Sequence, residues 1–177
     1  MGIFICATTA TGKSTLGKKY KNVIDMESVV FKYINEKGND ETRKSNPDRI
    51  PNPLYPQNYF DALESVKNKY DYILISDDVC MDYLIKNSYE YWQIFPAINL
   101  KDEYLKRCES RGNNKQFVKY FEQNWETWYY QCKNDIHAKK HIELQSNQFL
   151  EDVLPGLLKI NSWLNTIIFS KEILWLK

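Results

Sequence analysis

The stretch from Ile3 to Tyr20 constrains the fold more than any other part of the chain. It reads IFICATTATGKSTLGKKY. The four apolar residues at its start are typical of a short buried strand, and the residues from Ser14 onward favour a helix. The turn between them has only small side chains and is longer than a simple strand-to-helix connection needs. The stretch therefore predicts the first unit of an α/β fold built on a parallel sheet.

Apolar strand patterns and helix patterns alternate along the rest of the 177 residues. We expect strands at 2–6, 22–25, 70–76, 91–96 and 140–144, and helices at 13–20, 27–36, 56–68, 79–87, 101–111, 115–134 and from about 147. Residues 37–54 are polar and include three prolines and one glycine, so we expect them to be irregular. This order predicts one domain with three α/β/α layers around a parallel sheet of about five strands.

Composition and charge argue against several classes of function. The 24 basic and 23 acidic residues nearly cancel, which gives no global reason to expect nucleic-acid or membrane-surface binding. No apolar run approaches the ~20 residues that span a bilayer, and no signal peptide is visible. His137 and His141 are four residues apart without a glutamate in the H-E-x-x-H position, so we interpret them as solvated rather than metal-binding. Four cysteines lack metal-ligand spacing and read as reduced thiols of a cytoplasmic protein: Cys6, Cys80, Cys108 and Cys132.

Residues Ala7 to Ser14 match the pattern G-x-x-x-x-G-K-[ST], with alanine where the first glycine is usual. Small residues let backbone N–H groups surround phosphate oxygens, helped by the start of the following helix. In this pattern Lys13 reaches the β- and γ-phosphates, and the Ser14 hydroxyl binds Mg²⁺. The pattern predicts an ATP and Mg²⁺ site with these residues: Thr8, Thr9, Ala10, Thr11, Gly12, Lys13, Ser14 and Thr15.

This stretch resembles the Walker A loop of P-loop kinases, and the whole chain looks like the small phage or bacterial nucleoside monophosphate kinases in its order of elements. The resemblance implies a P-loop NTPase-type fold in a single kinase domain with a short helical lid. It implies an acceptor-binding segment at 37–60, a lid region at 101–134 and a loop at Ser146 and Asn147 that touches adenine. The implied activity is ATP- and Mg²⁺-dependent transfer of the γ-phosphoryl group to a nucleotide, foremost a (deoxy)nucleoside monophosphate.

Carboxylates stand at the ends of two expected strands, the edge where open α/β sheets bind ligands. Asp77 and Asp78 follow the strand at 70–76, and Asp25 ends the strand at 22–25. We predict that Asp77 serves Mg²⁺ or the acceptor and that Asp78 contributes to the acceptor site. Asp25 could orient the acceptor, take a proton from an acceptor hydroxyl or serve Mg²⁺. The alternative for each is that it caps the helix that follows.

Basic residues occur in two places that suit a phosphate. Arg107, Arg111 and Lys115 are spaced by four residues, and the break at 112–114 predicts a hinged tip that closes over ATP. The alternative is a solvated face whose cations pair with Glu103 and Glu109, with Glu103 four residues before Arg107. Arg43 and Arg49 lie in the long polar loop, where they could hold an acceptor phosphate or be ordinary surface charges.

Several interpretations stay open at this level. The aromatic residues at 115–134 predict mainly a core-facing surface, although one or two rings could reach the ligand and stack on a base. The tail 155–177 is either a C-terminal helix packed on the sheet or a dimer contact, so both a monomer and a homodimer fit. The acceptor could instead be a polynucleotide 5′-hydroxyl or a modified base in DNA. A further alternative is an ATP-binding switch that is not a kinase.

Overall fold

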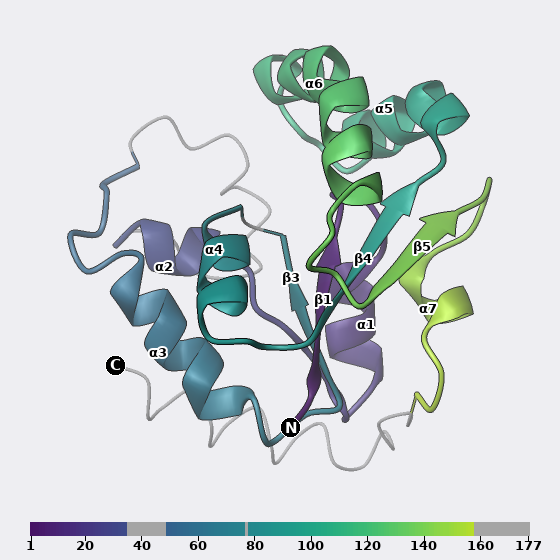
Figure 1. The fold of residues 1–177 in the computed structure, drawn as a ribbon. Coiled ribbons are helices and arrows are strands. Elements are labelled where there is room, and N and C mark those ends of the chain that lie inside the picture. The colour runs from purple at the N-terminus through teal and green to yellow at the C-terminus, as the bar shows by residue number, and fades with distance from the viewer. Residues whose placement is uncertain (35–48, 77, 158–177) are drawn as a thin grey trace.

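Five parallel strands form the central sheet of the computed structural model, which describes residues 1–34, 49–76 and 78–157. The strands are β1 Ile3–Ala7, β2 Val23–Asp25, β3 Tyr72–Ile75, β4 Tyr91–Pro96 and β5 Lys140–Leu144. Their order across the sheet is β2-β3-β1-β4-β5 (Figure 1). The predicted three-layer α/β/α fold with about five parallel strands is confirmed. Arg43, Asp77 and the tail beyond residue 157 lie outside the described residues.

Strand β1 lies at the centre of the sheet because it pairs with β3 on one side and with β4 on the other. The chain first moves from β1 across β3 to the edge strand β2, and later moves to the opposite side of β1. All five carboxyl ends meet at one edge of the sheet. The carboxyl end of β1, where the strand order changes direction, is the position at which open α/β sheets generally bind ligands.

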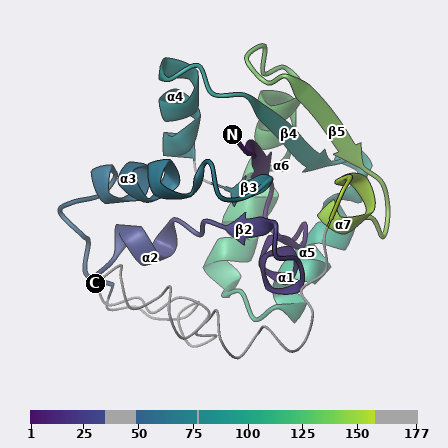
Figure 2. The ribbon, with the colours of Figure 1, turned by 90° about the horizontal axis from the view of Figure 1, so that it is seen from below.

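Helices cover both faces of the sheet (Figure 2). Helix α1 Lys13–Lys19 and helix α7 Leu150–Val153 cover one face, where Leu16, Leu74 and Leu150 belong to one buried cluster. Helices α3 Gln57–Val66 and α4 Asp78–Lys86 cover the other, where Tyr59 and Leu84 are fully buried. Apolar residues that alternate along β1 enter the two clusters in turn, as a strand buried on both faces requires.

Helices α5 Lys101–Ser110 and α6 Lys115–Lys133 follow a short 3₁₀ turn, Ile98–Leu100, and lie above the carboxyl ends of the strands (Figure 1). They form a third cluster in which Tyr104, Phe121 and Trp125 are buried. The core-facing surface expected at 115–134 is thereby confirmed. The predicted break between the helices is also present, since Gly112 has a φ of 76° and the Asn114 side chain caps α6.

Two predicted helices are wrong in extent. Helix α2 spans only Val29–Lys32 of the expected 27–36, because Tyr33 is extended and pairs with Pro51. The helix expected from about 147 begins at Leu150 and spans four residues, because Asn147 adopts a left-handed conformation with a φ of 62°. Among the helices of the described residues, none is long and apolar enough to cross a membrane.

Candidate functional site

The β1–α1 loop, residues 8–12, curls tightly at the carboxyl end of the central strand. Ala10 and Gly12 take left-handed conformations with φ values of 62° and 98°. Thr11 is fully buried, and its hydroxyl donates to the carbonyl oxygen of Thr8 over 2.7 Å. Left-handed residues within such a turn produce concave arrangements of backbone N–H groups that bind anions. Ala7 fits its position because it is the last residue of β1, where it pairs with Ile94.

Lys13, the first residue of α1, folds back onto this loop. Its ammonium group donates to the carbonyl oxygens of Ala7 and Thr8 over 2.7 and 2.8 Å. Burial lowers the pKa of Lys13 from 10.5 to about 8; the carboxylate of Asp25 opposes this shift, and the charge of Arg111 adds to it. Two cations that repel each other across one space are stabilised by an anion placed between them.

Ser14 and Asp25 form a pair of oxygen groups beside Lys13. The Ser14 hydroxyl donates to the Asp25 carboxylate over 2.8 Å. Burial raises the pKa of Asp25, while Lys13 and the Ser14 hydrogen bond act in the opposite direction. The alternative in which Asp25 caps the next helix is wrong, since Ser28 occupies the N-cap of α2.

Gly17 explains how Asp25 comes so close to α1. A β-carbon on Gly17 would lie 3.1 Å from the backbone nitrogen of Asp25 and 3.2 Å from its β-carbon. A larger residue at this position would require Asp25 or the helix to shift by a few tenths of an ångström. Sequence reasoning overlooked Gly17, although a glycine inside a predicted helix is a recognised sign of close packing.

Hydroxyl and carboxylate oxygens are the ligands that Mg²⁺ prefers, usually one or two from the protein together with substrate phosphates. The Ser14 and Asp25 pair fits this donor set. The described residues contain no group of three or more histidine, cysteine, aspartate or glutamate side chains that could hold a metal by itself.

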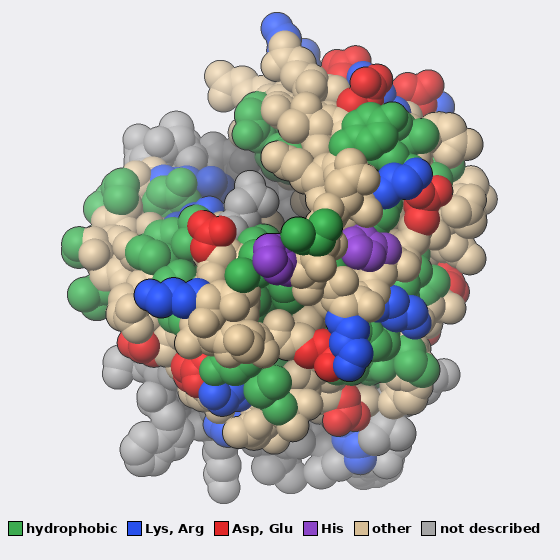
Figure 3. Space-filling model, viewed as in Figure 1, with side chains coloured by type: hydrophobic (Ala, Val, Ile, Leu, Met, Phe, Trp, Pro, Cys, Tyr) green, Lys and Arg blue, Asp and Glu red, His purple; other side chains and the backbone are tan. Residues whose placement is uncertain are grey.

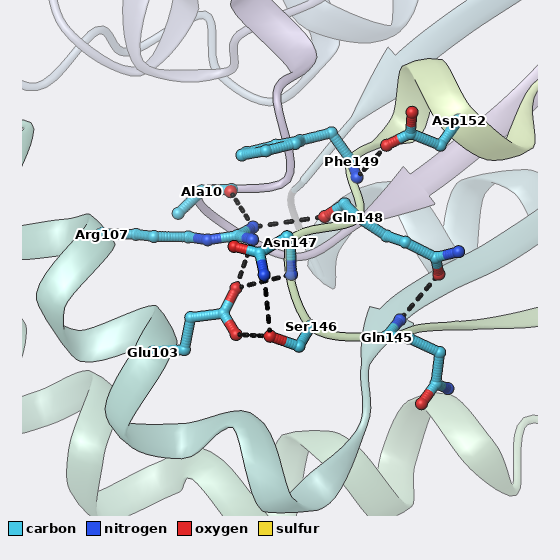
Figure 4. A network of polar contacts seen from close by, with 9 residues as sticks. All are labelled: Ala10, Glu103, Arg107, Gln145, Ser146, Asn147, Gln148, Phe149 and Asp152. Atoms are coloured by element: carbon cyan, nitrogen blue, oxygen red, sulfur yellow. Dashed lines mark hydrogen bonds and ion pairs between the residues drawn. The ribbon is translucent and has the colours of Figure 1, made fainter.

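Arg107 of α5 is fixed against the β1–α1 loop (Figure 4). Its guanidinium group donates to the carbonyl oxygens of Ala10 and Gln148, each over 3.4 Å. The group also lies over two aromatic rings, 4.5 Å from the centre of Tyr104 and 4.2 Å from that of Phe149. Arg107 is therefore already engaged with protein groups, and it connects α5 to the loop and to the segment after β5.

Glu103 completes this network from one turn earlier on α5. Its carboxylate accepts from the Arg107 guanidinium over 2.5 Å, from the Ser146 hydroxyl over 2.8 Å and from the Asn147 backbone over 3.1 Å. Although burial opposes it, these hydrogen bonds hold the pKa of Glu103 below its usual range. The predicted pairing of Glu103 with Arg107 is confirmed, but it lies within a network rather than on a solvated face.

The remaining predicted site residues are more dispersed. Arg111 ends α5 and is exposed, yet its charge acts on Lys13. Lys115 is the exposed first residue of α6, and the break at 111–114 separates it from the other two cations. Arg49 lies over the ring of Tyr33 at 5.1 Å. Asp78 is the first residue of α4. Thr9 lies in the loop and is partly buried, and Thr15 is an exposed residue in the first turn of α1.

Comparison with known proteins adds no identification. No protein-family model matches the chain. No curated protein gives a significant sequence match either. The functional argument therefore depends on the fold and on the geometry of the site.

Proposed function

We propose that this protein is a phosphotransferase that moves the γ-phosphoryl group of ATP to a nucleotide, foremost a (deoxy)nucleoside monophosphate. The observation that carries the proposal is the position of Lys13. A partly buried ammonium group with a lowered pKa lies on a curled loop at the carboxyl edge of a parallel sheet, beside a hydroxyl and carboxylate pair. A polyanion that brings its own metal ion satisfies all of these groups at once.

Each group has a defined task in this reaction. The β1–α1 loop holds the phosphate oxygens of ATP through its backbone, and Lys13 neutralises the β- and γ-phosphates. Ser14 and Asp25 would hold Mg²⁺, which neutralises phosphate charge when it is bound. Arg111 supplies positive charge to the equatorial oxygens of the group in transfer. Positioning and charge stabilisation therefore provide most of the catalysis.

The acceptor decides what Asp25 does. The γ-phosphorus forms a bond to an acceptor oxygen as its bond to the β-phosphate oxygen breaks, which leaves ADP. A monophosphate acceptor already has an anionic oxygen, so Asp25 then serves only orientation or the metal. A hydroxyl acceptor loses a proton in the same step, and the Asp25 carboxylate takes it.

A phosphate-transfer screen tests the proposal. The protein is incubated with ATP and Mg²⁺ and with each nucleoside monophosphate, each nucleoside or a 5′-hydroxyl oligonucleotide, and ADP and the labelled product are measured. We expect rapid product formation with one monophosphate, its loss in Lys13→Ala and its retention in Lys18→Ala, which removes an exposed lysine from the same helix. ADP formation that does not depend on any acceptor would indicate an ATPase or a switch instead.

A further inference from the structure

Strand β5 forms one edge of the sheet, and among the described residues no strand lies on its outer side (Figure 2). An edge strand presents a row of backbone N–H and C=O groups with which another strand can pair. The opposite edge strand, β2, has three residues, whereas β5 has five. The β5 edge is therefore the longer of the two places where the sheet can be extended.

The register of β5 shows which of its residues face outward. The Ala97 N–H donates to the carbonyl oxygen of Leu144 over 2.9 Å, so Leu144 faces β4. The N–H and C=O of one residue point to the same side of a strand, and this side alternates along it. The backbone groups of His141 and Glu143 therefore point away from the sheet. The Glu143 carbonyl oxygen accepts from the Gln145 side chain over 3.4 Å, which is longer than a typical backbone hydrogen bond.

Lysines commonly protect an edge strand against pairing, but the two lysines at this edge are directed toward their own molecule. The Lys140 ammonium lies over the ring of Trp92, 4.5 Å from its centre. Lys139, just before β5, forms an ion pair with Glu90 over 2.5 Å. Both charges are thus held beside the start of β4 rather than across the outer side of β5.

The sequence of β5 is complementary to itself in an antiparallel pair. With a two-fold axis at Ile142, His141 of each copy lies directly opposite Glu143 of the other, and their outward backbone groups pair. Side chains that are directly opposite have β-carbons about 5 Å apart, so the imidazole N–H can donate to the carboxylate. The two Ile142 side chains meet on the other face of the sheet, since side chains alternate between faces.

Other registers of the same pair are less favourable. A two-fold axis at Glu143 would place two glutamates directly opposite each other, and like charges in that position are destabilising. An axis at His141 would pair the two imidazoles and leave each Glu143 without a complementary side chain. The charge pattern of β5 therefore selects the register centred on Ile142.

Contacts with α6 hold Glu143 in place on this face. The Tyr129 hydroxyl donates to the Glu143 carboxylate over 2.8 Å, and the Lys133 ammonium donates to the Tyr129 hydroxyl over 3.0 Å. A carboxylate has about four acceptor sites, so Glu143 can accept from the imidazole of a second copy as well. His141 is exposed, and Figure 3 shows both histidines of the chain, in purple, at the surface.

We propose that the β5 edge is the interface of a homodimer, in which two β5 strands pair antiparallel and join the sheets of both copies. The joined sheet contains five strands from each copy. The same surface serves both copies, so one two-fold axis closes the assembly and no further copies are added. The proposal does not depend on the phosphotransferase activity.

Sedimentation equilibrium of the full chain tests the interface with two substitutions at one position. His141→Pro removes an outward N–H and no hydrogen bond to β4, a change that edge strands tolerate. His141→Glu places a glutamate opposite Glu143, and His137→Glu makes the same change at an exposed residue outside β5. We expect a wild-type dimer, a Kd raised about tenfold or more in both His141 variants, and no change in His137→Glu.

The exchange variant His141→Glu/Glu143→His restores the opposite pair in reverse order, so it should associate more tightly than His141→Glu. Circular dichroism identifies any variant that does not fold; if His141→Pro is one, His141→Glu and the exchange variant decide. A wild-type protein that stays monomeric up to millimolar concentration would overturn the proposal. A dimer that the His141 variants leave unchanged would also overturn it, because another surface, such as the tail beyond residue 157, would then form the contact. Equal losses in His137→Glu and His141→Glu would overturn it too, since net charge alone would explain them.

Discussion

The β1–α1 loop and the Arg107 network lie against each other, yet they are built in different ways. Within the loop, Thr11 contacts Thr8 and Lys13 contacts Ala7, so partners are three to six residues apart in the chain. Arg107, in contrast, reaches Ala10 from 97 positions away and Gln148 from 41. The hydrogen bonds within the loop are thus local in the chain, whereas the network exists only once three distant segments have packed together.

Because the loop has local contacts and the Arg107 network has long-range ones, we expect substitutions in the two regions to have different effects on activity. The hydrogen bonds that Thr11 and Lys13 make within the loop do not involve α5 or α6, although Ala10 packs against residues of both helices. The network depends on how α5 and the segment after β5 are placed, and it joins α5 to that segment and to the loop. Substitutions in the loop should therefore remove activity, and substitutions in the network should change affinity.

After the loss of transfer expected in Lys13→Ala, the next largest effect should come from Asp25, which joins the loop region to the end of β2. We expect Asp25→Asn to lower kcat about a hundredfold, because the amide neither matches the Ser14 hydroxyl in the same way nor offers a charged oxygen to Mg²⁺. Coupled ADP release with the preferred acceptor measures the effect. Glu27→Gln is the matched control, since it removes a nearby negative charge that also acts on Lys13 but leaves the Ser14 contact in place. Equal losses in both variants would mean that only the charge matters.

Arg111 tests whether the second cation belongs functionally to the loop. We expect Arg111→Ala to lower kcat roughly twentyfold with little change in the KM of ATP, because its charge is needed mainly as the phosphoryl group moves. Removal of this charge also raises the pKa of Lys13, so the loss of ATP affinity at alkaline pH should move to higher pH. Lys106→Ala, which removes an exposed lysine of the same helix, should leave kcat and the pH profile unchanged. Turnover that is intact in Arg111→Ala would contradict the role of α5 in catalysis.

Substitution of Glu103 tests the Arg107 network without changing any residue of the β1–α1 loop. We expect Glu103→Gln to raise the KM of ATP about fivefold and to affect kcat less, because Arg107 loses its charged partner and Asn147 loses a strong acceptor. Glu103→Asp should recover part of the affinity, whereas a purely structural loss would not respond to the conservative change. Glu109→Gln provides the control, since Glu109 is an exposed glutamate of the same helix. A larger loss in kcat than in affinity would place Glu103 with the loop rather than with the network.

The same division explains which features could be predicted from the sequence. The strand, turn and helix at 3–20 and the break at 112–114 are local patterns, and both are present as expected. The place of Phe149 over Arg107 could not be predicted, because it depends on where β5 ends relative to the loop. The left-handed Ala10 was also unexpected, since alanine rarely adopts that conformation and is held in it here by tertiary packing.

The smallest expected effect is on the free energy of unfolding, and it measures how much the charge of Lys13 destabilises the folded protein. The pKa of Lys13 is about 8 in the folded protein and 10.5 ordinarily, so between these values the unfolded chain binds more protons. The wild-type free energy of unfolding therefore rises with pH across this window. At pH 7 we expect Lys13→Met to be more stable than wild type by about 1 kcal/mol. Relief of the buried charge is worth roughly 3 kcal/mol, and the two lost hydrogen bonds cost about 1 kcal/mol each.

Urea unfolding at pH 7 and at pH 9.5 measures this difference. The advantage of Lys13→Met should shrink at the higher pH, where the wild-type lysine loses its proton in the folded state. Lys18→Met should show no such pH dependence, because Lys18 is exposed. If Lys13→Met is less stable at both pH values, the hydrogen bonds of the lysine to Ala7 and Thr8 hold the loop together, and the ammonium group has a structural role. If Lys13→Met is instead more stable but inactive, the Lys13 charge lowers the stability of the folded protein and is needed for activity, a trade-off common in functional sites.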